Sequence, residues 1–171
     1  GGPRPTEAVP QIIELGGRVL DNAHAYGADG SVYFDVSTFP AYGALSGYDR
    51  DEMVRIAAER GGRPDDPAKR DPLDFTLWQP SLEDEPSWDA PFGAGRPGWH
   101  IECSAMVLSA HGETLDLHGG GTDLIFPHHE SEIAQSTSIT GQPLARHWVH
   151  SAMVAYDGEK MSKSLGNLVF V

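Results

Sequence analysis

The order of local patterns between residues 114 and 155 is the feature that most constrains the fold of this 171-residue chain. Thr114–His118 is a short run of β-forming residues that leads into three consecutive glycines, Gly119–Gly121. A helical segment opened by a proline, Phe126–Ser136, follows, and His147–Ala155 then predicts a second strand. Strand, glycine turn, helix and strand in this order are typical of a parallel α/β sheet, whose ligands bind beyond the carboxyl ends of the strands. The sequence therefore predicts an α/β fold with a site near the glycines.

Patterns before residue 114 predict further elements. Apolar residues at helical spacing predict helices over Thr6–Tyr26 and Asp49–Arg60, and alternation predicts a short strand over Ser31–Val36. The stretch Pro80–Pro97 is dense in Pro, Gly, Trp and acidic residues, which favours an irregular connection. Beyond that stretch, Gly98–Leu108 is expected to form a buried helix.

Composition limits the partners of this chain. It has 12 Lys and Arg residues against 25 Asp and Glu residues, a formal net charge of -13. That is the wrong sign for a surface that holds a nucleic-acid backbone by itself, so any RNA contact is expected to be local or to lie outside this segment. The single cysteine, Cys103, excludes an intrachain disulfide and makes a cytoplasmic location the default expectation. A run of about 18 apolar residues is missing, so no membrane partner is expected.

Cys103, His128 and Glu132 give the strongest metal signal. His128 and Glu132 are four residues apart on a predicted helix and share one face, while Cys103 comes from a separate element. Thiolate, imidazole and carboxylate are ordinary zinc ligands, and four-coordinate zinc needs one more partner, which these residues do not reveal. The alternative is structural, with Cys103 as a small buried hydrophobe and His128 bonded to backbone at the helix start. Spacing does not decide between the two interpretations.

The other histidines carry less information. His129 follows His128 directly and points to a different side of the helix, so we treat it as a neighbour of the metal ligands. His118 ends a predicted strand before the glycines and either faces a ligand pocket or caps the strand. The remaining histidines have no assigned role; among them are His100, His111, His147 and His150.

Two further segments suit a nucleotide. Gly119–Gly121 lets a backbone approach a ligand closely, and Asp123 could then hold a ribose hydroxyl, but a glycine triplet is also typical of a tight turn. Lys160 and Lys163 lie three residues apart in a Ser-containing polar loop and can place positive charge on nucleotide oxygens as pyrophosphate leaves. As a charge pattern alone, this is an ordinary solvated loop.

The literal string Lys160-Met161-Ser162-Lys163-Ser164 is the KMSKS signature of class I aminoacyl-tRNA synthetases. Gly98–Met106, His118–Asp123 and Phe126–Ser136 resemble the cysteine-specific branch of that class, and the similarity extends over nearly the whole chain. The chain is identified as a member of the family that contains the class I cysteinyl-tRNA synthetases and the MshC cysteine ligases of mycothiol synthesis.

The resemblance implies a division of the chain and a zinc site. Residues 1–95 would be a connective segment, and residues 96–171 the second half of a Rossmann-like catalytic domain that includes the KMSKS loop. Cys103, His128 and Glu132 would bind one zinc ion together with a further cysteine from an upstream strand. Zinc prefers a thiolate, so the ion would select cysteine over serine, two substrates that shape alone discriminates poorly.

The resemblance also implies the roles of the residues that bind substrate. Trp99 and His128 would line the cysteine pocket. ATP, bound as Mg-ATP, would be contacted by Gly119, Gly120, Gly121 and Asp123, and its phosphates by the catalytic lysines Lys160 and Lys163. The implied reaction is attack of the L-cysteine carboxylate on the α-phosphate of ATP, which gives cysteinyl-adenylate.

The chain departs from the family pattern in two ways. It contains no His-x-Gly-His signature, and the upstream zinc cysteine is missing with it. In the family both belong to the first half of the catalytic domain. We therefore expect the chain to be an internal fragment that does not catalyse ATP–pyrophosphate exchange alone.

Two branches of the family differ in the acceptor of the activated cysteine. Several segments resemble the MshC ligases, which transfer cysteine to the amine of a glucosaminyl-inositol: Ser46–Arg50, Ala58–Gly62, Asp71–Asp74 and Gly166–Val171. The residues around the metal and the ATP loop resemble the tRNA ligases instead: His118, Glu132–Ser136 and Ser164–Asn167. We place tRNA-Cys first because the site-lining residues follow that pattern. A non-catalytic zinc-binding module is a third interpretation, but it leaves Lys160 and Lys163 without a function.

Overall fold

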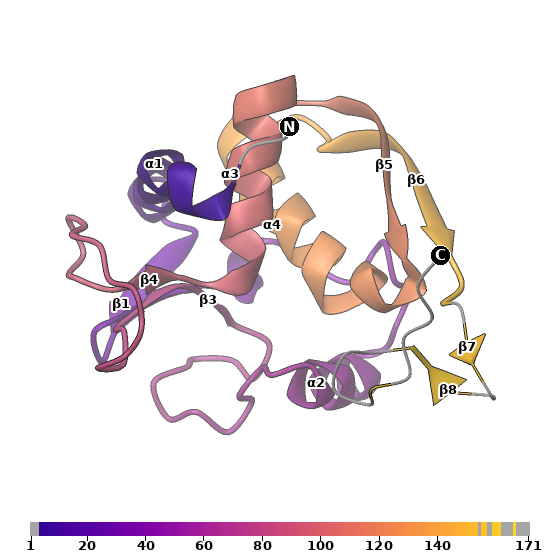
Figure 1. Ribbon diagram of the computed structural model, residues 1–171, viewed down its shortest axis with the longest axis horizontal. Coiled ribbons are helices and arrows are strands. Elements are labelled where there is room, and N and C mark those ends of the chain that lie inside the picture. Colours follow the sequence, from indigo (N-terminus) through magenta and orange to yellow (C-terminus); the bar gives the residue numbers. More distant parts are fainter. Residues whose placement is uncertain (1–3, 154, 157–158, 162–165, 167–171) are drawn as a thin grey trace.

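The computed structural model describes residues 4–153, 155–156, 159–161 and 166 (Figure 1). Its α-helices are α1 (Val9–Asp21), α2 (Arg50–Glu59), α3 (Trp99–His111) and α4 (Glu130–Thr140). Its strands are β1 (Ala25–Ala28), β2 (Ser31–Phe34), β3 (Phe75–Gln79), β4 (Arg96–Pro97), β5 (Leu115–Gly121), β6 (Ala145–Ser151), β7 (Ala155–Tyr156) and β8 (Glu159–Lys160). Short 3-10 turns are η1 (Pro5–Glu7), η2 (Val36–Thr38) and η3 (Thr122–Leu124), and η4 (Ile125–His129) is a π-helical turn.

An antiparallel sheet contains β1, β2, β3 and β4 in chain order. Asp29 and Gly30, between β1 and β2, have positive φ angles of 48° and 76°, as a tight two-residue hairpin requires. The predicted strand at residues 31–36 is confirmed as β2. The predicted helix at residues 6–26 runs too far, because Tyr26 lies in β1 and packs its ring beside Tyr33, with centroids 5.8 Å apart.

A single hydrophobic core joins the sheet to the helices and includes side chains from both residues 1–95 and residues 96–171. Figure 1 shows α3 standing between α1 on one side and β5 and β6 on the other. Leu15 and Val19 of α1 are buried in this core together with Ile101 and Ala105 of α3. Burial of a Leu, Val or Ile side chain contributes roughly 1.5–3 kcal/mol, so this contact fixes α3 firmly in place.

Polar residues cap the start of α2 and form most of the buried face of α4. The Asp49 side chain accepts a 2.8 Å hydrogen bond from the backbone N–H of Glu52, which caps α2 where the sequence predicts its start. The buried face of α4 is largely polar and consists of Glu130, Ser131, Glu132, Ala134, Gln135 and Ser136. Within the part of the chain that the structure describes, no helix has both the length and the apolar character needed to cross a membrane.

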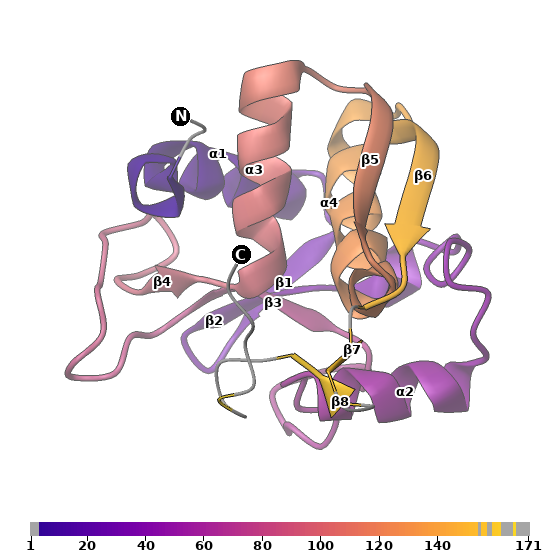
Figure 2. The ribbon, with the colours of Figure 1, turned by 45° about the vertical axis from the view of Figure 1, so that its right-hand side comes forward.

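The predicted parallel pair is confirmed: β5 and β6 run in the same direction, with His118 opposite Trp148 and Gly120 opposite His150. Figure 2 shows α3 and α4 beside these two strands. The glycines differ from the expectation of a turn, because Gly119–Gly121 belong to β5 and pair with β6 as far as Ser151. At Gly120 an added Cβ would lie 2.8 Å from Cε1 of His129, so only glycine lets the strand pass this ring.

Candidate functional site

The structure brings together the three residues that the sequence selects as metal ligands. Cys103 lies on α3, His128 near the end of η4, and Glu132 in the first turn of α4. One ligand atom from each lies within 4.8 Å of the other two. His128 Nε2 is 3.7 Å from Glu132 Oε1, so the two share a face although His128 belongs to a π-helical turn. A thiol, an imidazole and a carboxylate converge in this way where a zinc ion can be held.

His100 orients His128 for such a role. Their Nδ1 atoms are 2.9 Å apart, so one of the two nitrogens must donate a proton to the other. Burial lowers the pKa of His100 to about 3, with the nearby His128 as a smaller cause, so His100 is neutral at pH 7. If His128 donates from Nδ1, its Nε2 keeps a free lone pair on the side of Glu132. Metal-binding histidines are commonly fixed by a hydrogen bond from their other nitrogen in this way.

The second oxygen of Glu132 faces two other histidines. His118 Nε2 is 2.8 Å from Glu132 Oε2, and His129 Nε2 is 3.9 Å from the same oxygen. These three residues also place one ligand atom each within 4.8 Å of one another. His129 stays outside the group with Cys103, as the sequence predicts, yet it lies on the same carboxylate. Glu132 therefore connects both groups, and the His118 ring holds its orientation.

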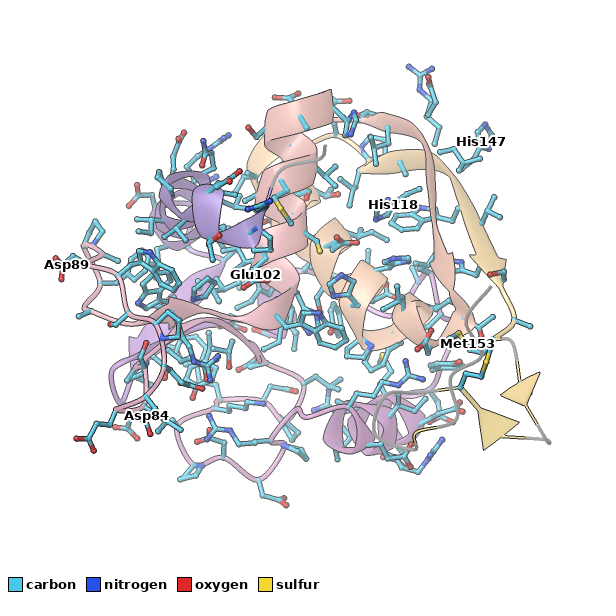
Figure 3. The ribbon with its side chains drawn as sticks, viewed as in Figure 1. Asp84, Asp89, Glu102, His118, His147 and Met153 are labelled. Carbon is cyan, nitrogen blue, oxygen red and sulfur yellow. The ribbon has the colours of Figure 1, made fainter. Side chains whose placement is uncertain are left out.

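Three histidines place a ring nitrogen within 3.9 Å of this carboxylate, and two more contact those rings. We call these five the histidine cluster: His100, His118, His128, His129 and His150. His129 Nδ1 lies 2.7 Å from His150 Nε2 on β6. In Figure 3, His118 lies on the inner side of β5, whereas His147 points outward from β6. Sequence reasoning left His100 and His150 unassigned. The available signal for His150 was its position two residues after Trp148, which places both on the same face of a strand.

The Cys103 thiol is half-buried and sits among carboxylates. Burial raises the pKa of Cys103 to about 11, with Glu132 and Glu102 as further causes. The side chain is therefore a neutral thiol at pH 7 when no cation is close, and a divalent cation would stabilise its thiolate. These donors fit zinc, because they combine a soft thiolate, a borderline imidazole and a hard carboxylate.

Trp99 forms the exposed wall of this group. Its ring stacks on His128, with centroids 4.7 Å apart and an interplanar angle of 26°. The side chain is 49% exposed, which is high for a tryptophan that already packs against a neighbour. Trp99 thus leaves an aromatic surface open to a small ligand beside the candidate metal-binding group.

The residues expected to contact ATP are placed only in part. Gly119, Gly120 and Gly121 end β5, and Asp123 lies two residues after Gly121, in η3. They lie at the carboxyl end of a parallel strand, the edge where α/β sheets bind ligands. Lys160 lies in β8, and Lys163 lies outside the described residues.

The start of α4 is held by residues from earlier in the chain. Buried Glu130 accepts hydrogen bonds from the backbone N–H groups of Leu45, at 3.3 Å, and Ser46, at 3.0 Å. Arg60 donates to the carbonyl of Phe126 at 3.0 Å. These bonds lock the turn that carries His128, so the site depends on residues that the sequence alone does not connect to it.

The buried neutral histidines predict a loss of stability in acid. Burial keeps the pKa of His100 at about 3 in the folded chain, against an ordinary value of 6.5. Below pH 6.5 the unfolded chain binds a proton that the folded chain does not. His100 should therefore lower the free energy of unfolding by about 1.4 kcal/mol per pH unit between about pH 6.5 and 3.

Urea unfolding from pH 7.5 to 4.5, with a chelator present, checks this. The free energy of unfolding of the His100→Gln protein should decrease less steeply with falling pH than that of the unsubstituted protein. His147→Gln is the matched control, because it removes an exposed histidine from β6. Equal slopes in the unsubstituted protein and His100→Gln would contradict the assignment of His100 as a buried neutral base.

Comparison with known proteins shows the family of the chain. The sequence model of the family "tRNA synthetases class I (C) catalytic domain" matches residues 2–171. The chain is 53% identical over 167 residues to a cysteine--tRNA ligase of Aquifex aeolicus (strain VF5), covering 98% of this chain and 33% of that protein. It is 54% identical over 170 residues to a cysteine--tRNA ligase of Picosynechococcus sp., covering 99% and 36%.

A relative with a different acceptor in its name is equally similar. The L-cysteine:1D-myo-inositol 2-amino-2-deoxy-alpha-D-glucopyranoside ligase of Kribbella flavida is 53% identical over 166 residues, covering 96% of this chain and 41% of that protein. The chain spans 33% to 41% of the length of these three relatives. Because the family model matches nearly every residue, the chain belongs to the class I cysteinyl-tRNA synthetase catalytic-domain family.

Proposed function

We propose that this chain is part of an enzyme that activates L-cysteine with ATP and transfers the cysteinyl group to tRNA-Cys. The observation that carries this proposal is the convergence of Cys103, His128 and Glu132 within 4.8 Å, beside the half-exposed ring of Trp99, in a chain of this family. In this proposal, residues 1–95 connect the catalytic halves and residues 96–171 form the second half. A cytoplasmic location belongs to the proposal, since a thiol substrate requires reducing surroundings.

Three side chains would hold a zinc ion through Cys103 Sγ, His128 Nε2 and Glu132 Oε1. When bound there, zinc supplies a soft cation that accepts a thiolate in preference to a hydroxyl, and so favours cysteine over serine. His100 fixes the ring of His128, and His118 fixes the carboxylate of Glu132, at 2.9 Å and 2.8 Å. The donors are thus oriented before substrate arrives, which lowers the cost of binding.

The reaction places an anionic nucleophile near an anionic nucleotide. A carboxylate oxygen of cysteine would form a bond to the α-phosphorus of ATP as the bond to pyrophosphate breaks. We assign Gly119–Gly121 and Asp123 to the adenosine, and Lys160 and Lys163 to the negative charge of the Mg-ATP phosphates. These assignments are supported by the position of the glycines at the end of β5 and by the KMSKS string.

The tRNA acceptor is favoured by the pair His118 and Glu132. Glu132 is one of the three proposed metal ligands, and His118 contacts it at 2.8 Å. Both positions carry the residues of the tRNA-ligase pattern. The second candidate is transfer to the amine of a glucosaminyl-inositol, as in an MshC ligase. It is supported by the 53% identity to the Kribbella flavida protein, because overall identity does not separate the two branches.

The test offers both acceptors to the complete gene product. With cysteine and ATP present, we expect cysteine-dependent ATP–pyrophosphate exchange and cysteinyl-tRNA formation. Serine at the same concentration is the control, and it should support neither step. Product formed only with the amino sugar would overturn the tRNA assignment, and absence of cysteine-dependent exchange would overturn the activation step.

A further inference from the structure

The two carboxylate oxygens of Glu132 face different groups of side chains. Oε1 lies on the side of His128, at 3.7 Å from its Nε2. Oε2 lies 2.8 Å from His118 Nε2 and 3.9 Å from His129 Nε2. The candidate zinc site that includes Cys103 uses the first side of the carboxylate. The second side, with its two imidazoles, is a separate set of metal-ligating groups.

The spacing of this second set suits a small divalent cation. The ligand atoms of His118, His129 and Glu132 all lie within 4.8 Å of one another. Around a tetrahedral zinc ion with bonds of about 2.0–2.1 Å, ligand atoms are about 3.3 Å apart. The two measured separations from Oε2, 2.8 Å and 3.9 Å, lie on either side of that value, so small side-chain rotations would reach it. Two imidazoles and a carboxylate are ordinary zinc ligands and leave the fourth position to water.

The His129 ring is held with Nε2 toward this carboxylate. Its Nδ1 lies 2.7 Å from His150 Nε2 on β6. An added Cβ at Gly120 would lie 3.2 Å from His129 Nε2, so glycine leaves room beside that nitrogen. The Trp148 ring packs against His129, with centroids 5.2 Å apart. A hydrogen bond at the other ring nitrogen and close packing are the usual supports of a metal-bound histidine.

His118 gives this group its access to solvent and an adjustable ligand. The His118 side chain is 18% exposed, whereas those of Glu132 and His129 are 1% and 3% exposed. Figure 3 shows His118 on the inner side of β5. In its present contact, Nε2 of a neutral His118 donates its proton to the carboxylate. To bind a cation through Nε2, the ring takes its other neutral form, with the proton on Nδ1, so no proton leaves the ring.

We propose that His118, His129 and Glu132 bind a second zinc ion, separate from the one assigned to Cys103. The Glu132 carboxylate would bridge the two ions, with one at each oxygen. Two divalent cations on one carboxylate repel each other, so the second ion should bind at least about 100-fold more weakly than the first. Dialysis should then remove it and leave one zinc ion per chain.

The second ion would act against the first. It replaces the hydrogen bond from His118 that orients Glu132, and it draws charge from the same carboxylate. Zinc in excess should therefore lower cysteine-dependent ATP–pyrophosphate exchange by about tenfold, as the loss of a group that orients a metal ligand does. The binding of the second ion itself does not depend on the proposed reaction.

The test titrates the dialysed, metal-free full-length protein with cobalt(II), which takes zinc sites and absorbs light. Cobalt bound to the Cys103 thiolate gives thiolate-to-metal charge-transfer absorption, whereas the second set of ligands contains no sulfur. We expect a first ion that brings this absorption and a second, weaker ion that adds visible bands without it. A single ion at saturation would overturn the inference.

His118→Gln keeps an N–H donor for Glu132 but lacks an imidazole to bind the metal. It should bind the first ion with its charge-transfer absorption, which also reports that the variant folds, and should lose the second ion. Exchange in this variant should respond to excess zinc by less than about twofold, relative to its own rate with one ion. His147→Gln is the matched control, because His147 is an exposed histidine of β6 outside this group, and it should bind both ions.

Two results separate this inference from the proposed function. A second ion that His118→Gln binds as tightly as the unsubstituted protein does would overturn the second site and leave cysteine activation untouched. If the unsubstituted protein shows no cysteine-dependent exchange, the proposed function fails. Loss of the second ion in His118→Gln would still support the second site in that case.

Discussion

Cys103→Ser in the full-length protein should remove the bound zinc and lower cysteine-dependent ATP–pyrophosphate exchange by at least about 100-fold. Loss of a residue that only orients a ligand already costs 10- to 100-fold in metal affinity or activity, so loss of a ligand should cost more. A serine hydroxyl is a poor substitute because it is a hard donor and stays protonated near neutral pH. Zinc analysis of the purified protein and the exchange assay measure the two effects.

The design separates a metal ligand from a buried packing residue. Serine is close to cysteine in size, and Cys103 is only half-buried, so the fold should survive the change, as circular dichroism can show. Ser109 is exposed near the end of the same helix, so Ser109→Ala is the matched control. That variant should keep both its zinc content and its ATP–pyrophosphate exchange rate. Unchanged zinc content in a folded Cys103→Ser protein would rule Cys103 out as a ligand and favour the packing interpretation.

The second half of the chain was the easier part to predict. The period-2 and helical patterns that indicate β5, α4 and β6 are local, and a helix between two strands is the crossover connection that a parallel pair needs. Helical spacing also predicted that His128 and Glu132 share a face, as their 3.7 Å separation shows. That Cys103 meets them depends on the packing of α3 against α4, and sequence spacing could only make it plausible.

Other features required tertiary contacts that no local pattern reveals. The end of the predicted first helix is instead β1, because pairing with β2 outweighs the helical spacing near Tyr26. The glycines were expected in a turn, but they belong to β5. Position 120 needs glycine because the His129 ring occupies the space that a side chain would fill. The histidine cluster also escaped prediction, since it gathers residues from η4, α3 and two strands. The direction of a histidine ring in a π-helical turn cannot be inferred from regular helical periodicity.

A cavity of about 220 Å³ beside Trp99, which Arg60, Arg63 and Lys69 also line, shows the same limit for charged residues. In sequence, Arg60, Arg63 and Lys69 occur in a polar loop rich in Pro and Asp, which reads as a solvated surface. Folding brings this loop against the start of α3 and pairs most of its acids with arginines. Net charge therefore says little about where positive charge collects, which depends on how the loop folds against α3.

Gly98→Ala should lower the free energy of unfolding by about 3 kcal/mol, because α3 begins in direct contact with the antiparallel sheet. An added Cβ at Gly98 would collide with the carbonyl oxygen of Thr76 in β3. The Gly98 N–H also donates to the Leu77 carbonyl at 2.9 Å, so the two backbones are tied at this point. Neither can move without disturbing the other, and a backbone atom cannot swing away as a flexible side chain does.

This contact matters for the site because Trp99 and Cys103 follow Gly98 on the same helix. A shift of the helix start would move the ring of Trp99 off His128 and open the cavity beside it, so zinc affinity should fall along with stability. Gly17→Ala is the matched control: Gly17 lies inside α1, nothing lies within 4 Å of an added Cβ, and alanine should stabilise the helix by up to about 1 kcal/mol. Urea unfolding and zinc titration of both variants measure these effects. A Gly98→Ala protein as stable as the unsubstituted one would show that the approach of α3 to β3 is looser than the structure places it.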